Sequence, residues 1–297
     1  MDFVSQNGTP PPAPGTLNTS TVSTLQGTGI VPQIFMGALL IVILYIVCVM
    51  IEQFYSFYKS SMTIPIKLMP NSYSTEDKSI TVAQNPLNPS ANSIVLSNNE
   101  RTGIEFTYSF FVLVHPSTFR TEKGLLHIFH KGFPGQYPLL GPGVYMRSDT
   151  NCMRVYMNTY KTWNNYVEVD NFPVGKWVHV AVVCKGSSLQ VYINGNLSKK
   201  LSFDGFQAYQ NYQDIICFSQ RRIMVQHSQY PSTDEEGFQV FGAMKGLFSK
   251  LYYYNYALSY TEINEQMNDG PSSKMDTASL DKPPYLADNW WSMNYGV

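Results

Sequence analysis

The strongest feature of the hydrophobic pattern is an unbroken apolar run near the N-terminus. Residues 30–51 read IVPQIFMGALLIVILYIVCVMI, without a charged side chain, and Gln33 is the one strongly polar residue. As an α-helix these 22 residues would be about 33 Å long, enough for a hydrocarbon core of about 30 Å. The run is apolar on all sides of such a helix, which argues against the half-buried helix of a soluble domain. The pattern therefore predicts a transmembrane helix over residues 30–59.

The residues that follow the run are typical of a membrane interface. The segment EQFYSFYKS, residues 52–60, places four aromatic rings before a lysine, and such side chains favour the boundary between lipid and water. A cleaved signal peptide would have a basic start and a shorter apolar run. Here nearly thirty residues without Lys or Arg come first. The predicted anchor residues are Ile30, Phe35, Leu40, Ile43, Tyr45, Ile51, Tyr55, Tyr58 and Lys59.

The distribution of lysines predicts the orientation of the span. Residues 1–29 contain no Lys or Arg, whereas Lys59, Lys67 and Lys78 follow the run. Because Lys and Arg mark the cytoplasmic flank, we expect a translocated N-terminus and a larger C-terminal part on the cytosolic face. Outside the run, three cysteines remain, and an odd number argues against a disulfide framework. This fits a reducing compartment.

Beyond the span, the pattern changes to short stretches of alternating apolar and polar residues separated by Gly, Asn, Asp and Pro, which is typical of strands. In MRVYMNTY, for example, Met153, Val155 and Met157 would share one face. Twelve stretches carry such a signal: 79–83, 92–96, 104–114, 125–132, 143–149, 152–160, 166–172, 177–184, 188–195, 199–203, 214–220 and 246–258.

One segment, Ser259–Met267, carries a helical signal instead, with Ser259 as N-cap, Glu262 three residues on and Gly270 past the end. Many short strands with a single helix predict an all-β antiparallel sandwich. The domain would occupy residues 79–270.

The remaining segments are predicted from composition. Residues 1–29 are rich in Pro, Thr and Ser and are expected to be disordered or extended. Residues 60–78 are expected to form a linker, and residues 271–297 a Pro- and Trp-rich tail. The formal charge is −1, so no global field would recruit nucleic acid, and no cofactor is expected.

The segment FPVGKWVHVAVVCKGSSLQVYINGNLSKK, residues 172–200, resembles the laminin-G-like, concanavalin A-like jelly-roll family. Further landmarks are GIEFTYSFFVLVHP and the closing segment that starts at Phe238. The positions that carry the resemblance are Pro173, Gly175, Trp177, His179, Val180, Ala181, Tyr192, Asn194 and Gly195. It implies a jelly roll over residues 79–270. We expect Trp177 between the sheets and His179 directed away from the Val178 side.

Several residues are candidates for chemistry, but none forms a complete set. Glucan hydrolases of this superfold carry three carboxylates on one strand, whereas here Glu168 and Asp170 lack the third. His127 and His130 are three apart in a predicted strand and should face opposite sides. Calcium-dependent lectins use Asp and Asn ligands at a sheet rim. The candidates Asp149, Asn151, Asp204 and Asp214 form no dense cluster, so turn formation is expected for each.

The primary hypothesis is therefore a non-enzymatic, single-span structural protein whose partners are the bilayer and other proteins. The architecture resembles that of membrane-anchored minor capsid proteins of large icosahedral DNA viruses, which implies capsid partners and a virion inner membrane. The alternative is a cell-surface carbohydrate-binding or adhesion module, and a glucan hydrolase is less favoured. Exposed aromatic residues suit contacts with partners. The contact candidates are Tyr252, Tyr254, Trp290, Trp291 and Tyr295.

Overall fold

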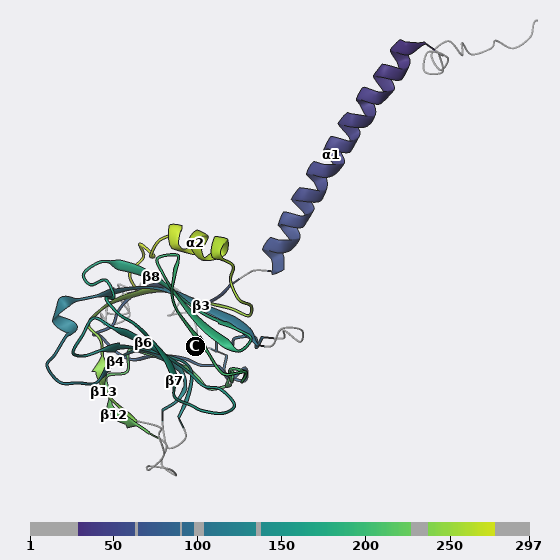
Figure 1. Cartoon of the computed structure of the whole chain (residues 1–297). Helices are drawn as coiled ribbons and strands as arrows, with labels where there is room; N and C mark the ends of the chain where they lie inside the picture. The colour runs from purple at the N-terminus through teal and green to yellow at the C-terminus, as the bar shows by residue number, and fades with distance from the viewer. Residues whose placement is uncertain are drawn as a thin grey trace, which may run out of the picture. The chain divides into compact units, whose positions relative to one another are not determined.

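The computed structural model describes residues 29–62, 65–89, 91–97, 104–134, 138–226 and 237–276. The chain divides into two compact units, residues 1–64 and 65–297 (Figure 1). The first contains helix α1 (Ile30–Met62) and the second a β-sandwich. The contact candidates Trp290, Trp291 and Tyr295 lie outside the described residues, as do the predictions for residues 1–28.

Helix α1 confirms the predicted helix and extends it to Met62. Its segment Gln33–Tyr55 has a mean hydropathy of 3.1, and none of it is buried. By length and composition, α1 can therefore cross a membrane. The predicted anchor residues from Ile30 to Tyr55 are all exposed. The side chains of Tyr58 and Lys59 lie outside the described part of the helix.

The first layer of the sandwich is a six-stranded antiparallel sheet. Its strands, in spatial order, are β1 (Ile66–Ser74), β14 (Gly246–Tyr254), β3 (Glu105–Val114), β8 (Trp177–Lys185), β9 (Ser188–Ile193) and β10 (Asn196–Ser202). The β9–β10 turn is formed by Asn194 and Gly195, with φ angles of 46° and 77°. Both residues thus have positive φ, as this two-residue hairpin turn requires.

The second layer is an eight-stranded sheet. Its main path runs through β12 (Arg222–Val225), β13 (Phe238–Ala243), β4 (Leu125–Phe133), β5 (Leu139–Arg147), β6 (Met153–Met157) and β7 (Asn165–Val169). Off this path, β11 (Ile215–Cys217) pairs with β4 and with β2 (Ile80–Val82). The β13–β4 pairing is parallel, and the other pairings are antiparallel. A 3₁₀ helix, η2 (Pro116–Thr118), follows β3.

The core lies between the two sheets and is built largely from alternate residues of the strands. Met153, Val155 and Met157 all belong to it, as the alternation predicts. The inner faces of β3 and β8 contribute aromatic and β-branched side chains to this core. Such side chains suit a pleated, buried surface. The predicted fold class, an antiparallel jelly-roll sandwich, is confirmed.

Helix α2 (Tyr260–Asn268) covers the outer face of the six-stranded sheet and lies beside β8 in Figure 1. Ile263, fully buried, packs there with Ala181 and Val183 of β8. A reciprocal capping box joins Ser259 and Glu262 at the helix start, and Gly270 follows the helix with φ of 64°. The predicted start and end of this helix are therefore confirmed.

Three segments differ from the sequence predictions. The predicted linker, residues 60–78, contributes β1, which the pattern did not indicate because Pro70 and two register shifts interrupt it. Pro is tolerated there because β1 is an edge strand. Residues 92–96 form no strand, since Ile94 N donates to the side chain of Gln84 rather than to a neighbouring strand. Strands β12 and β13 were not predicted.

The position of Trp177 was also predicted wrongly. Val178, Val180 and Val182 occupy the inner face of β8, so alternation places Trp177 on the outer face, where it is half-buried. His179 follows on that same outer face, and its predicted direction is confirmed. Its Nε2 lies 2.9 Å from Ser109 Oγ, and its ring lies 4.9 Å from the ring of Phe111.

The last described residues return to the start of the sandwich. Met275 forms a parallel bridge with Ser72 of β1. Ser72 N donates to Lys274 O at 2.9 Å, and Asp276 N donates to Ser72 O at 2.7 Å. Residues 274–276 thus lie along the outer edge of β1.

Candidate functional site

The carboxylates of β7 are engaged in ion pairs. Glu168 Oε1 accepts hydrogen bonds from Arg154 Nε at 2.9 Å and Nη2 at 2.6 Å. Its Oε1 also lies 3.6 Å from Arg147 Nη1. Asp170 lies beyond the end of β7, and its Oδ2 is 3.5 Å from Lys199 Nζ. The two carboxylates are therefore held by separate cationic partners.

A polar and aromatic network surrounds Glu168 on the outer face of the eight-stranded sheet. The Arg154 guanidinium lies 4.4 Å from the centre of the Tyr166 ring, a cation–π contact. Its Nη1 donates to Tyr156 Oη at 3.0 Å. Nearby, Arg147 donates two hydrogen bonds to Asp149, at 3.0 and 2.9 Å. The hydrogen bond from Arg147 lowers the pKa of Asp149, so this network is a set of satisfied ion pairs.

The four candidate calcium ligands serve local structure. Asp149 is paired with Arg147, and Asn151 Nδ2 donates to Phe172 O at 3.3 Å. Asp214 Oδ1 accepts from Gln84 N at 2.8 Å, and Asp204 lies in a turn with φ of 51°. Across the described ranges, no three His, Cys, Asp or Glu side chains lie together as metal ligands.

The two histidines of β4 lie on the same side of the strand, which corrects the prediction that they face opposite sides. His127 Nε2 is 2.6 Å from His130 Nδ1. The physical reason is a β-bulge, because His127 pairs with Tyr145 while Phe129 pairs with Val144. Two steps on β4 thus match one step on β5, which resets the alternation.

Hydrogen bonding assigns the tautomers of this pair. Ser219 N donates to His127 Nδ1 at 2.9 Å, so neutral His127 carries its proton on Nε2 and donates it to His130 Nδ1. His130 then carries its proton on Nε2, a buried atom without a partner among the described residues. Burial lowers the pKa of His127 well below its usual value, and it lowers the pKa of His130 to about 4. The pair is neutral at physiological pH.

The four cysteines are free, and three of them are buried. Cys184 and Cys217 belong to the core, where burial raises the pKa of the Cys184 thiol to about 12. Cys184 therefore packs as a small apolar residue, as predicted.

The contact candidate Tyr254 is not at the surface. It is 3% exposed and packs against Leu258 and Ile263, because α2 and the segment before it cover this part of β14. Tyr252, on the same face, is half-buried. Alternation correctly separates these two from Tyr253, which lies in the core, but the covering layer makes Tyr254 unavailable to a partner.

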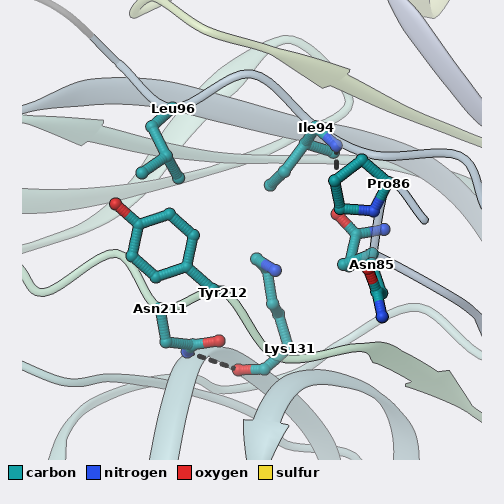
Figure 2. Close-up of a pocket in the computed structure, with 8 residues that line it drawn as sticks. Asn85, Pro86, Ile94, Leu96, Lys131, Asn211 and Tyr212 are labelled. Carbon is teal, nitrogen blue, oxygen red and sulfur yellow. Dashed lines mark hydrogen bonds between the residues drawn. The ribbon is translucent and has the colours of Figure 1, made fainter.

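A pocket of about 290 Å³ opens at the rim of the sandwich. We call it the Lys131 pocket (Figure 2). Its lining comes from the loop after β2, the segment 91–97, the end of β4 and the loop before β11; the residues are Gln84, Asn85, Pro86, Ile94, Leu96, Lys131, Asn211 and Tyr212. Sequence reasoning missed this pocket. The one available signal was a lysine inside the apolar stretch LLHIFHKG.

Comparisons with known proteins support the resemblance at the level of fold. A family model described as the Concanavalin A-like lectin/glucanases superfamily matches residues 88–223. The β-sandwich therefore has a laminin-G-like, concanavalin A-like fold, and an apolar helix precedes it. No curated protein matches the sequence.

Among solved structures, the chain is similar to two binding domains. The receptor binding domain of botulinum neurotoxin D is 13% identical with a TM-score of 0.44, over 67% of this chain and 43% of that chain. The binding domain of Paraclostridial Mosquitocidal Protein 1 is 13% identical with a TM-score of 0.44, over 70% of this chain and 46% of that chain. The chain thus spans less than half the length of either structure.

Proposed function

We propose that this protein is a non-enzymatic, single-span membrane protein whose jelly roll makes contacts with other structural proteins. The observation that carries the proposal is the exposure of α1. Its 23-residue segment Gln33–Tyr55 is strongly apolar, and none of it is buried. An apolar surface of this length is stable only in an apolar surrounding, which a bilayer supplies.

Two exposed loops supply the contact surface in this proposal. Thr159 bridges Ala208, and Tyr160 N donates to Gln207 O at 3.3 Å, so the loops lie side by side. Three rings on these loops are exposed: those of Tyr160, Phe206 and Tyr212, at 67%, 40% and 74%. Exposed aromatic side chains are frequent anchors of protein interfaces.

The setting that we propose is a membrane that lies beneath an icosahedral viral capsid, with the jelly roll on the capsid side. Two features support this setting. One is the architecture of one anchor and one jelly roll, and the other is the presence of lysines after the span but not before it. The translocated N-terminus would then lie on the opposite side of the bilayer.

Crosslinking in intact particles or membranes tests the contact proposal. A lysine-reactive crosslinker should capture other structural proteins through Lys161, whose Nζ lies 5.0 Å from the centre of the Phe206 ring. The expected products are peptides that join this loop to a capsid protein, identified by mass. Crosslinks confined to the chain itself, in preparations where capsid proteins crosslink to one another, would contradict the proposal.

Protease treatment of sealed vesicles with the cytosolic face outward tests the orientation. The proposed topology predicts that the jelly roll is digested, and digestion after detergent addition serves as the control. A jelly roll that is protected until detergent is added would favour the carbohydrate-binding alternative, with reversed topology. The non-enzymatic assignment fails if the protein hydrolyses a β-glucan and Glu168→Gln abolishes that turnover.

A further inference from the structure

We propose that the Lys131 pocket receives one acidic side chain, an aspartate or a glutamate, from the structural protein that the jelly roll contacts. This inference rests on the proposed function and deepens it, because it names the chemical group of the partner that the contact surface recognises. Three observations carry it: a buried cation at the floor of the pocket, N–H donors of that cation without a protein acceptor, and an exposed contact ring in the pocket wall.

The strand places the lysine at the floor of the pocket. Phe129 belongs to the core, and Lys131 lies two residues further along β4, so both side chains leave the strand on the same side. Lys131 is 1% exposed. In Figure 2 its side chain rises between Tyr212 and Asn85. The cation is therefore reached only through the pocket.

The ammonium has fewer partners than a buried cation requires. Lys131 Nζ donates one hydrogen bond, to Gln213 O at 2.5 Å, whereas an ammonium has three N–H donors. No ion pair of Lys131 occurs among the described residues. Asp214 raises its pKa from a distance, but Asp214 Oδ1 accepts from Gln84 N. Burial lowers the pKa of Lys131 to about 8, so the group is cationic at pH 7.

The charge of the pocket selects an anionic group. Of the eight residues that line it, Lys131 is the only one with a charged side chain at pH 7. A carboxylate has two oxygens that accept hydrogen bonds, and such bonds to an ammonium are short and strong. A buried charge is stable when it is paired. A carboxylate from outside the chain would thus complete the set of partners of Lys131.

The position and size of the pocket favour a protein side chain over a free acid. The ring of Tyr212, one of the three exposed rings proposed as contacts, forms part of the wall, so the pocket and the contact surface are continuous (Figure 2). The volume is about 290 Å³, below the usual range of small-molecule sites, about 300–1,000 Å³. One ion pair holds a free acid weakly, whereas neighbouring contacts raise the effective concentration of a side chain on a bound partner.

The remaining walls suit the methylene groups of such a side chain. Ile94 and Leu96 lie across the space from Tyr212 (Figure 2), and an apolar surrounding strengthens the attraction between opposite charges. Gln84 Oε1 accepts from Ile94 N at 3.0 Å, which braces this wall. The pocket is therefore formed before the partner arrives, and preorganisation lowers the entropic cost of binding.

The test uses the protein that crosslinking through Lys161 captures. That protein is purified, and its affinity for the full-length chain in lipid nanodiscs is measured at pH 7. Lys131→Gln should weaken binding about tenfold or more, because it removes a hydrogen bond between charged groups. Lys123→Gln removes an exposed lysine and should bind the partner as the unmodified chain does.

A second variant tests the pocket without removing the lysine. Leu96→Trp adds bulk to a half-buried wall position and should also weaken binding severalfold, because it blocks entry. Leu197→Trp, at a 50% exposed position of β10, is the control for added bulk and should leave the affinity unchanged. Thermal denaturation shows which variants are folded, so Leu96→Trp decides if Lys131→Gln unfolds.

A double-mutant cycle identifies the acidic side chain. Each Asp and Glu of the partner near the crosslink is changed to its amide, and one of these changes should cost less affinity in Lys131→Gln than in the unmodified chain. Unchanged binding by both folded pocket variants, or no acidic residue coupled to Lys131, would overturn this inference and leave the contact proposal intact. Failure of Lys161 to capture any partner would instead contradict the proposed function, and this inference with it.

Discussion

Helix α1 and the core of the sandwich use the same residue types in opposite surroundings. Ile41 and Val42 of α1 are 70% and 53% exposed, whereas Ile128 of β4 and Val180 of β8 are fully buried. The difference lies in the order of the residues. An unbroken apolar run leaves no face for water, whereas alternation assigns one face of a strand to the interior. The apolar content of a segment alone thus does not tell whether lipid or a protein core surrounds it.

The two regions also differ in the polar groups they enclose. The sandwich buries His127, His130 and His179 beside its core strands, whereas the span of α1 contains no ionisable residue between Gln33 and Tyr45. A fold can provide hydrogen-bond partners for a buried polar side chain, but lipid cannot. The following predictions test this contrast, from the largest expected effect to the smallest.

Deleting a ring should be costly in the core and harmless in the helix. Phe110 is fully buried, and its ring lies 5.3 Å from those of Phe129 and Phe248. Phe110→Ala should lower the free energy of unfolding by about 3–5 kcal/mol, measured by urea denaturation of the sandwich in detergent. The matched variant Phe54→Ala, at a 72% exposed position of α1, should change it by less than about 0.5 kcal/mol. Equal losses of unfolding free energy in the two variants would contradict the contrast between the core and α1.

A charge should be tolerated on the sandwich surface but not within the span. Leu44→Arg places a cation near the middle of α1 and should disfavour insertion by about 2.5–3.5 kcal/mol. The readout is the fraction of protein that resists alkaline extraction from membranes. Leu197→Arg, at a 50% exposed position of β10, should remain membrane-bound. If Leu44→Arg were retained as fully as Leu197→Arg, α1 would not be held by lipid.

Acid should destabilise the sandwich through its buried histidines. Burial lowers the pKa of His179 to about 4, while an unfolded histidine titrates at about 6.5. Between these values the unfolded chain binds more protons, so stability is full above pH 6.5 and declines towards pH 4. Each such histidine contributes a slope of up to about 1.4 kcal/mol per pH unit. Urea denaturation at several pH values measures it.

Substitutions assign that slope to particular residues. His179→Gln should make the decline below pH 6.5 shallower, because the glutamine takes up no proton. His115→Gln, at an exposed position, serves as the control and should leave the slope unchanged. An identical slope in both variants would exclude His179 as a source.

The smallest effect concerns the second helix, which is held by the protein rather than by lipid. Ser259→Ala removes the N-cap of α2 and one half of its capping box. The loss should be about 1 kcal/mol in the free energy of unfolding. Ser202→Ala, at an exposed position at the end of β10, should stay within about 0.5 kcal/mol of the unmodified chain. If Ser259→Ala lost no more stability than Ser202→Ala, the cap would not contribute to the stability of α2.

Sequence reasoning succeeded where a local pattern decides the structure. The turn at Asn194 and Gly195, the cap at Ser259 and the alternation of Met153 and Val155 are each determined within a few residues. It failed where the environment of a residue depends on a segment that is distant in the sequence. Tyr254 is hidden because α2 folds back over β14, which its own strand does not reveal.

The histidine pair and the pocket show the same limit. The bulge that brings His127 towards His130 depends on pairing with β5, so strand alternation alone mispredicts it. The Lys131 pocket collects its lining from four separate segments. A single buried lysine was the only trace of it in the sequence, and its partners could not be inferred before the fold was known.

The parallel bridge between Ser72 and Met275 has a mechanical consequence. The chain enters the sandwich from α1 at the start of β1, and it leaves after Asp276, alongside that same strand. Because the two segments run parallel, tension between the anchor and the C-terminal tail pulls them in opposite directions along their length. The hydrogen bonds between them are then loaded together, in shear, rather than opened one after another. A pull applied beyond Asp276 would thus reach the start of β1 along this one edge of the sandwich.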